Sequence, residues 1–189
     1  VVKRMTPDAL LDTYDAERHA VGARVLRNTM AQVGLSRVDE RTKALSAVMT
    51  ELLGADDARR RFAAEMSGLA IRYDFGEGHP LLGRRMPDLD IVVAGKSLRV
   101  FTLLHDARPL LLNFDKRDDI DIDGWTDRVL RIDARCEGPW QLPALGEVPA
   151  PSAVLVRPDG YVAWVGEGAM DGLADALTRW FGPPRGVAK

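Results

Sequence analysis

Before Gly76, apolar residues recur at helical spacing among many charged ones. A helix is predicted to start at Thr6, Pro7 and Asp8. The hydroxyl of Thr6 can accept a bond from a free backbone amide of the first turn, and Pro7 loses nothing there by lacking an amide hydrogen. The carboxylate of Asp8 lies near the positive end of the helix dipole, where a negative charge is favourable. The helix is predicted to run to about Val33 and to end at Gly34. Leu11, Tyr14, Val21 and Val25 recur at helical spacing, and Arg18 falls on the same stripe, so this face is not wholly apolar.

Two shorter helices are predicted to follow. The second ends at Gly54, and the third begins with Asp56 as its cap. Their apolar stripes consist of Leu45, Val48, Met49 and Leu52 in the second helix, and Phe62, Met66 and Leu69 in the third. So few large side chains make a thin core, and we expect these helices to pack against something larger.

After Gly83 the pattern becomes that of strands. Continuous apolar runs at Leu110–Phe114 and Ala153–Val156 are typical of central strands covered on both faces. Arg157-Pro158-Asp159-Gly160 is a strong turn signal. The remaining predicted elements are a hairpin of strands 88–93 and 98–101, a short helix at 124–128, a strand at 129–133, a loop over 137–151, a strand at 161–165 and a final helix over 170–180.

This order of elements predicts an α/β protein in which a helical N-terminal segment precedes a thioredoxin-like domain, a central mixed sheet flanked by helices. The predicted domains are residues 1–78 and 79–189. The segment from Pro151 to Gly160 is similar to the part of the thioredoxin fold that carries a cis-proline, so a cis peptide bond is predicted before Pro151. Residues 83–89 resemble the opening of peroxiredoxin-like members.

Composition restricts the chemistry. Cys136 is the only cysteine, so the domain lacks a CxxC pair and cannot carry out thiol–disulfide exchange. Where redox members place a cysteine after the central strand, this chain reads Asp115-Lys116-Arg117-Asp118. A single cysteine favours the reducing cytoplasm. Twenty-six basic and 28 acidic residues give a net charge of -2, so neither nucleic acid nor a membrane surface is an expected partner.

No catalytic residue and no metal site is predicted. Asp119–Gly124 matches the first half of a calcium loop, but Leu130 replaces the required glutamate. Gly166-Glu167-Gly168 lacks the third glycine of a dinucleotide fingerprint, and Asp171 at that position would repel a pyrophosphate. The three histidines have no metal-ligand spacing and are assigned structural roles.

Several segments together resemble one family, the FAD-dependent aromatic hydroxylases of polyketide type, which are related to phenol hydroxylase. The similar segments are 10–19 (LLDTYDAERH), 66–73 (MSGLAIRY), 79–88 (HPLLGRRMPD), 101–105 (FTLLH) and 156–164 (VRPDGYVAW). The resemblance extends from about Thr6 to Gly182. Ala20 departs from the proline that many relatives have after the histidine, and alanine lets the helix continue.

The resemblance implies an oxidoreductase part, the section that follows the flavin-binding core of an aromatic-ring monooxygenase using NAD(P)H and O₂. The family's N-terminal GxGxxG unit does not occur in this chain, so we expect it to bind no FAD alone and to have a structural or assembly role. Its partner would be the flavin-binding N-terminal half, in the same polypeptide or in a separate chain. A homo-oligomer is also possible. The start at Val1 suggests a fragment.

Arg72 and Tyr73 are the substrate-side candidates, since both could reach a phenolic or quinone oxygen. The favoured interpretation is structural, a salt bridge at the junction and a packed ring. An alternative function is a free-standing, redox-inactive thioredoxin-like module that mediates binding or serves as a scaffold. A thiol oxidoreductase is excluded by the cysteine count.

Overall fold

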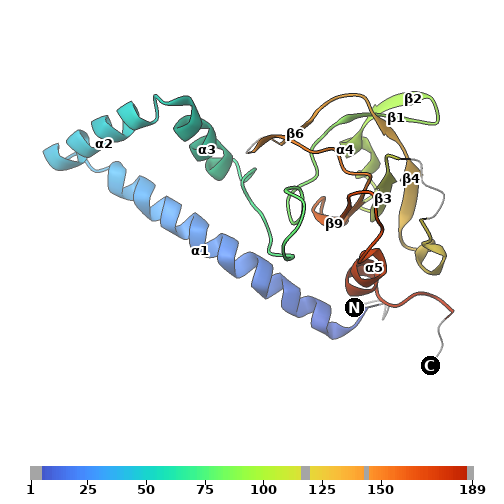
Figure 1. Ribbon diagram of the computed structural model, residues 1–189. Coiled ribbons are helices and arrows are strands. Elements are labelled where there is room, and N and C mark those ends of the chain that lie inside the picture. The colour runs from blue at the N-terminus through green and yellow to red at the C-terminus, as the bar shows by residue number, and fades with distance from the viewer. Residues whose placement is uncertain (1–5, 116–119, 143–144, 187–189) are drawn as a thin grey trace. The chain divides into compact units, whose positions relative to one another are not determined.

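The computed structural model describes residues 6–115, 120–142 and 145–186 of the 189-residue chain (Figure 1). The chain forms two compact units. The helical unit comprises residues 12–71, and the sheet unit joins residues 1–11 to residues 72–189. The predicted domain boundary after residue 78 stays a prediction. None of the described helices is both long and apolar enough to cross a membrane.

The helical unit consists of α1 (Asp12–Leu35), α2 (Glu40–Leu52) and α3 (Asp56–Met66). A 3₁₀ turn at Asp8–Leu11 precedes α1, which continues through Gly34 instead of ending there. Asp39 caps α2 by accepting a bond from the Thr42 amide at 3.0 Å, and this bond holds the pKa of Asp39 below its usual value. Asp56 is the first residue of α3 and not its cap, a position that Ala55 occupies.

The core of the helical unit is small, as predicted. Val21 and Ala64 are the only buried apolar side chains in residues 12–71, a range that the structure describes completely. An ion pair between Arg24 Nε and Glu65 Oε2 at 3.2 Å connects α1 to α3. The predicted inward faces of α2 and α3 are instead largely exposed, including Leu45, Val48 and Phe62. Periodicity indicated the helices correctly, but it did not show whether a partner covers them.

The sheet unit is built on four strands in the order β4-β3-β8-β9. β3 (Leu110–Asn113) pairs in parallel with β4 (Leu130–Asp133) and antiparallel with β8 (Ala153–Val156), which pairs antiparallel with β9 (Val162–Gly166). A 3₁₀ turn (Asp123–Trp125) precedes β4, and α5 (Leu173–Phe181) follows β9. The mixed α/β class is therefore confirmed, and the central strands and the final helix lie in the predicted order.

A second sheet has the order β2-β1-β5. Its hairpin joins β1 (Asp90–Val93) to β2 (Lys96–Arg99) through Ala94 and Gly95, both at positive φ, and β5 is Arg135–Cys136. Phe101 lies in the short helix α4 (Val100–Leu103) and not in a strand as predicted. The predicted loop over 137–151 contains a further hairpin of β6 (Trp140–Leu142) and β7 (Gly146–Val148).

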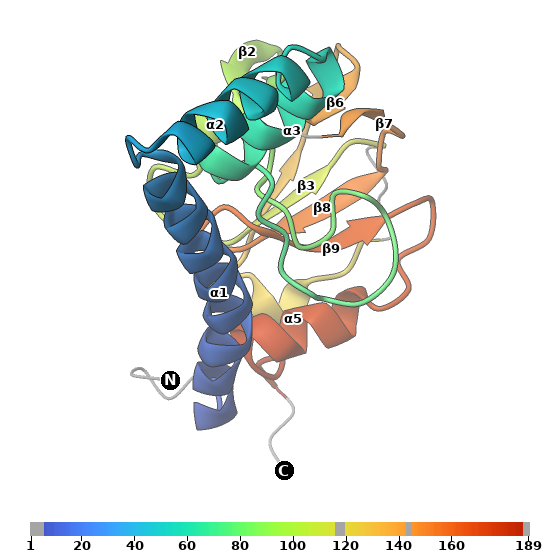
Figure 2. The same ribbon diagram turned by 90° about the vertical axis from the view of Figure 1, so that its left-hand side faces the viewer.

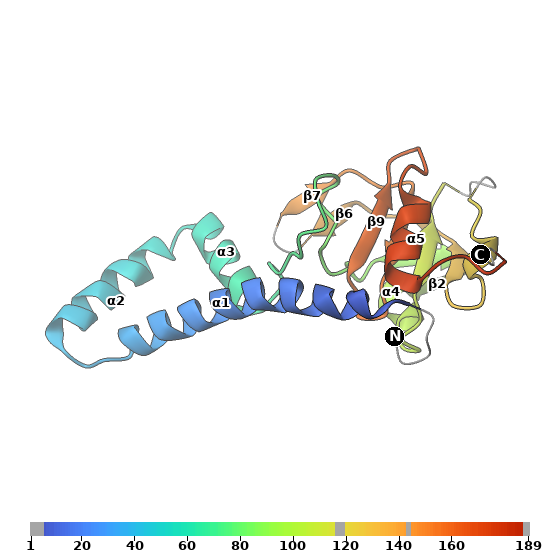
Figure 3. The same cartoon turned by 90° about the horizontal axis from the view of Figure 1, so that it is seen from below.

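Apolar side chains cover both faces of the four-stranded sheet. Successive residues of β3 point to opposite sides, so Leu110 and Leu112 join one cluster while Leu111 joins the other. The first cluster also contains Val100 of α4 and residues of the β6–β7 hairpin. The second contains Leu173, Leu177 and Trp180, the predicted inward face of α5, which packs against β9 (Figures 2 and 3).

The prediction of a cis bond before Pro151 is wrong, because that peptide bond is trans. The next residue explains why. The Ser152 amide donates to the Gly166 carbonyl at 2.8 Å, and the Ser152 carbonyl accepts from the Phe114 amide at 2.8 Å. The extended chain therefore enters β8 already paired on both sides, and no reversal of direction is needed at the proline.

Candidate functional site

The segment from Arg72 to Phe75 is attached to the edge of the sheet. The Tyr73 amide donates to the Gly83 carbonyl at 2.8 Å, and the Gly83 amide donates to the Val162 carbonyl of β9 at 3.0 Å. The chains approach closely: a Cβ on Gly83 would lie 2.0 Å from the Tyr73 carbonyl oxygen, and Gly83 has a φ of +75°. The sheet thus fixes the backbone that carries both candidate residues.

Arg72 is occupied by backbone carbonyls. Its Nε donates to the Leu82 carbonyl at 3.2 Å and its Nη2 to the Gly76 carbonyl at 3.3 Å. The guanidinium thereby closes the loop between those residues. A cavity of about 330 Å³ lies beside it, lined by Arg72, Tyr73, Asp74, Gly76 and Glu77. These contacts favour the structural interpretation, although the predicted salt bridge is replaced by bonds to carbonyls.

Tyr73 is 5% exposed and packs against a second tyrosine. Its ring centroid lies 4.4 Å from that of Tyr161 and 6.1 Å from that of Phe75. Burial, together with the charge and hydrogen bonding of Tyr73, raises the pKa of Tyr161 to about 12. Tyr161 therefore remains a neutral phenol at physiological pH.

Arg157 completes this cluster of aromatic rings. Its guanidinium carbon lies 4.4 Å from the ring centroid of Trp180, 5.4 Å from that of Phe75 and 5.7 Å from that of Tyr73. Its Nε also donates to Asp159 Oδ1 at 3.1 Å. The site has the composition of an aromatic cage for a cation, but the protein's own arginine already fills it. Sequence reasoning recognised Arg157 in a turn and in a segment similar to the family but not as part of this cluster, because the rings come from two segments that are distant from it in the sequence.

The two predicted side chains therefore have separate contacts: Arg72 bonds the loop carbonyls, while Tyr73 packs into the ring cluster. Both still line the cavity, and a role in contacting substrate stays a prediction. Pro151 is buried beside β8, outside the set of residues that lines this cavity.

The residues after β9 do not fit a dinucleotide pyrophosphate. The Gly168 amide donates to Ser152 Oγ at 2.9 Å, so it is already engaged within the chain. A Cβ on Gly166 would lie 2.6 Å from the Trp164 ring, which accounts for that glycine by close packing. Asp171 and Asp175 also place negative charge at the start of α5, where a phosphate would have to bind.

The calcium-like motif begins at Asp119, which lies outside the described residues. Within the described part, Ile120 and Ile122 are each 3% exposed and belong to the core cluster beside α5. The Asp121 side chain accepts a bond from the Asp123 amide at 2.8 Å. Packing and a local turn therefore explain the described part of this motif.

The helical unit presents a different kind of candidate, an apolar stripe on α2. Leu45, Val48 and Leu52 are spaced at i, i+3 and i+7, which places them on one helix face. Each is more than half exposed, at 54%, 53% and 58%. This pattern is typical of a face buried against another body.

Comparisons with known proteins agree on one family. The family profile described as "Aromatic-ring hydroxylase, C-terminal" matches residues 79–184. A Streptomyces rimosus 12-dehydrotetracycline 5-monooxygenase/anhydrotetracycline 6-monooxygenase is 43% identical over 182 residues, covering 94% of this chain and 35% of the relative. A rifampicin monooxygenase of Streptomyces venezuelae is 39% identical, covering 93% and 33%. The crystal structure of CabE, an aromatic hydroxylase from angucycline biosynthesis, matches with a TM-score of 0.87 and 44% identity, covering 97% and 38%.

Proposed function

Because the chain belongs to the aromatic-ring hydroxylases, we propose that it is the C-terminal section of a flavin-dependent monooxygenase that hydroxylates an aromatic or polyketide substrate. Its role is structural: it assembles with the flavin-binding section and is not catalytically complete alone. The observation that carries this proposal is the exposed stripe of Leu45, Val48 and Leu52. These residues have the helical spacing of side chains that pack into a core, yet each is more than half exposed.

The chain spans about a third of the length of the curated relatives it matches. The remaining length in those relatives is ample for a cofactor-binding section. We assign FAD to that section, because the glycine motif after β9 of this chain is engaged in internal bonds and packing and does not suit a pyrophosphate. Such a cofactor supplies the O₂-activating chemistry with NAD(P)H as the reductant. The single cysteine suits the reducing cytoplasm as the place of action.

In this proposal Arg72 and Tyr73 remain the candidates for contacting the substrate. The phenol hydroxyl of Tyr73 can donate a hydrogen bond to a phenolic or quinone oxygen. The guanidinium of Arg72 has two carbonyl partners, so it would have to release at least one of them to bind a ligand. The open face of their cavity is therefore better suited to positioning a group than to chemistry.

The test is to produce the chain with and without its flavin-binding section, encoded in the same or a neighbouring reading frame. Alone, it should retain no flavin absorbance. Together, the two sections should co-purify with FAD, oxidise NAD(P)H and add one oxygen atom to an aromatic polyketide, as detected by mass spectrometry. Val48→Asp should abolish co-purification, because it places a charge in the stripe that the assembly would bury. Thr50→Asp, on the opposite face of α2, is the matched control and should have no effect.

A free-standing, redox-inactive binding or scaffold module remains the second candidate. It is favoured by the sheet unit, which has apolar clusters on both faces of its own sheet. This hypothesis requires that the chain form a stable, flavin-free species. It also requires that Val48→Asp and Thr50→Asp behave alike in the co-purification test. Those results would contradict the monooxygenase proposal.

A further inference from the structure

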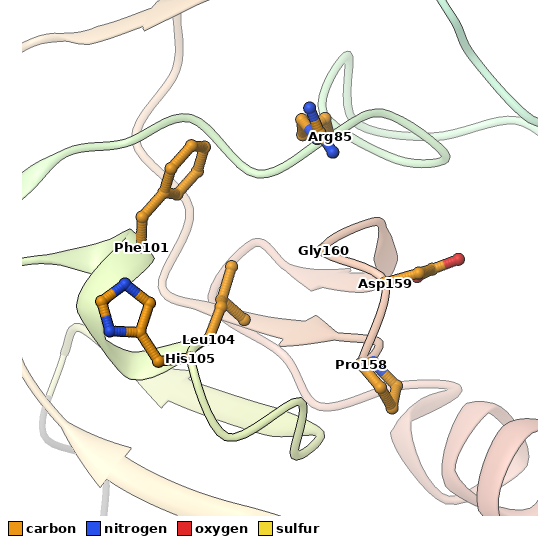
Figure 4. A pocket seen from close by; sticks show the side chains of 7 residues that line it. All are labelled: Arg85, Phe101, Leu104, His105, Pro158, Asp159 and Gly160. Carbon is orange, nitrogen blue, oxygen red and sulfur yellow. The ribbon is translucent and has the colours of Figure 1, made fainter.

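A second cavity lies on the sheet unit and shares no lining residue with the Arg72–Tyr73 cavity. It has a volume of about 290 Å³ (Figure 4). Three separate segments form it: the strand-like chain at Arg85, the end of α4, and the turn between β8 and β9. The lining residues are Arg85, Phe101, Leu104, His105, Pro158, Asp159 and Gly160.

The walls of this cavity are held in place by hydrogen bonds that backbone amides donate. The Met86 amide donates to the Gly160 carbonyl at 2.8 Å, and Arg85 forms an antiparallel bridge with Tyr161. On the other side, the Phe101 amide donates to Asp88 Oδ1 at 2.9 Å. The cavity is thus formed by a fixed framework, as expected for a ligand site that exists before the ligand binds.

The floor is apolar and includes an aromatic ring. Phe101 is 38% exposed, whereas most phenylalanine side chains are buried in a folded domain. Gly160, at a φ of +83°, leaves open the space beside Leu104, because a Cβ there would lie 3.8 Å from Leu104 Cδ1. A flat apolar ring can therefore lie against Phe101 and Leu104.

The rim carries one arginine and one histidine, Arg85 and His105. Within the described residues, the side chains of Arg85 and His105 make no hydrogen bond or ion pair, and they lie on different sides of the opening (Figure 4). The one acidic lining residue, Asp159, is already neutralised: it accepts bonds from Arg157 Nε at 3.1 Å and from the Tyr161 amide at 3.3 Å. Its carboxylate also points away from the cavity in Figure 4.

We propose that this cavity binds a mono- or bicyclic aromatic molecule that carries a carboxylate or phenolate. The ring packs on Phe101 and Leu104, and the anionic group pairs with the guanidinium of Arg85, while the imidazole of His105 lies on the other side of the ring. A guanidinium that makes no hydrogen bond or ion pair within the described residues matches the planar geometry of a carboxylate. A phosphate is a poorer occupant, because the apolar floor offers its oxygens no donors. The site is independent of flavin and of the proposed assembly.

The test measures binding of 1-naphthoate to the full chain by isothermal titration calorimetry and by NMR shifts of the Phe101 and Leu104 amides. Arg85→Gln should weaken binding about tenfold or more, because a charge-assisted pair is lost. Phe101→Ala should also weaken it. Arg135→Gln, which removes an exposed arginine outside the cavity, should leave the affinity unchanged. Circular dichroism confirms that each variant is folded.

The neutral analogue 2-naphthalenemethanol separates the role of the anion from that of the ring. It should bind at least tenfold more weakly than 1-naphthoate, and Arg85→Gln should not weaken it further. The proposal is overturned if 1-naphthoate does not bind, if Arg85→Gln binds it as tightly as the unmodified chain, or if the neutral analogue binds equally well. Since the chain is used without the flavin-binding section, these outcomes do not depend on the monooxygenase proposal.

Discussion

Arg157 acts as a packing residue although it carries a charge. Its guanidinium lies over Trp180, Phe75 and Tyr73, and thereby connects the end of β8 to α5 and to the segment after the helical unit. Asp159 balances the charge locally. This explains why an arginine is tolerated between aromatic rings, and it leaves the cage no space for an external cation.

Arg157→Lys should lower the free energy of unfolding by about 1–2 kcal/mol, because an ammonium group cannot stack on three rings and hold Asp159 at the same time. Arg157→Met should cost at least as much. Urea unfolding followed by tryptophan fluorescence measures both values. Arg135→Lys provides the control and should be neutral. Equal stability of all variants would mean that the stacked geometry adds nothing.

Tyr161 gives the sheet unit a pH dependence in the alkaline range. Its pKa is raised from about 10 to about 12. The folded state therefore keeps a proton that the unfolded state has already lost, so stability is complete below pH 10 and falls as the pH rises towards 12. Tyr161→Phe should flatten this part of the stability curve, whereas Tyr14→Phe, at an exposed position, should not. A curve of unchanged slope for Tyr161→Phe would assign the loss to another group.

At the scale of elements, local patterns predicted the central strands and α5, because a continuous apolar run or a helical stripe is visible within a few residues. The β6–β7 hairpin was missed. Its signal is the short alternation of buried Trp140, exposed Gln141 and buried Leu142, which prolines on either side obscure. The bond before Pro151 is trans, the lower-energy form of an X–Pro bond, and the cis prediction rested only on the likeness of the segment to another fold.

The contact between the Arg72–Phe75 segment and Gly83 can be tested by comparing two glycines. Both Gly83 and Gly95 have positive φ, so alanine strains the backbone at each by about 1 kcal/mol. Only at Gly83 does the new Cβ also meet backbone, 2.0 Å from the Tyr73 carbonyl oxygen, whereas Gly95 has nothing within 4 Å. Gly83→Ala should therefore lower the melting temperature well beyond Gly95→Ala. Similar losses would show that the segment shifts freely.

At the scale of the whole molecule, the cavity in Figure 4 shows what the sequence could not reveal. Arg85, Phe101 and Asp159 come from three segments far apart in the sequence, and although each segment resembles the family, nothing in the sequence indicated that the fold brings them together. Arg72 and Tyr73 were found because they are adjacent in the chain, so that a local pattern was enough to single them out. Their partners, the carbonyls of Leu82 and Gly76 and the ring of Tyr161, became known only from the fold.

The two units should differ in local stability. Ordering each backbone residue costs about 1–2 kcal/mol, and buried apolar surface must offset that cost. In residues 12–71 only Val21 and Ala64 are buried apolar side chains, whereas the sheet unit has two extensive clusters. Hydrogen exchange of the full chain should therefore show weak protection in α1, α2 and α3 and the strongest protection in β3 and β8.

Adding the flavin-binding section should raise protection selectively in α2, the helix that carries the exposed stripe, and leave β3 and β8 unchanged. The same measurement on Val48→Asp should show no such gain, while Thr50→Asp should behave as the unmodified chain. Helices already as protected as the sheet, without any partner, would mean that the helical unit is stable despite its small core. The exposed stripe would then no longer indicate a missing partner, because folding would not require its burial.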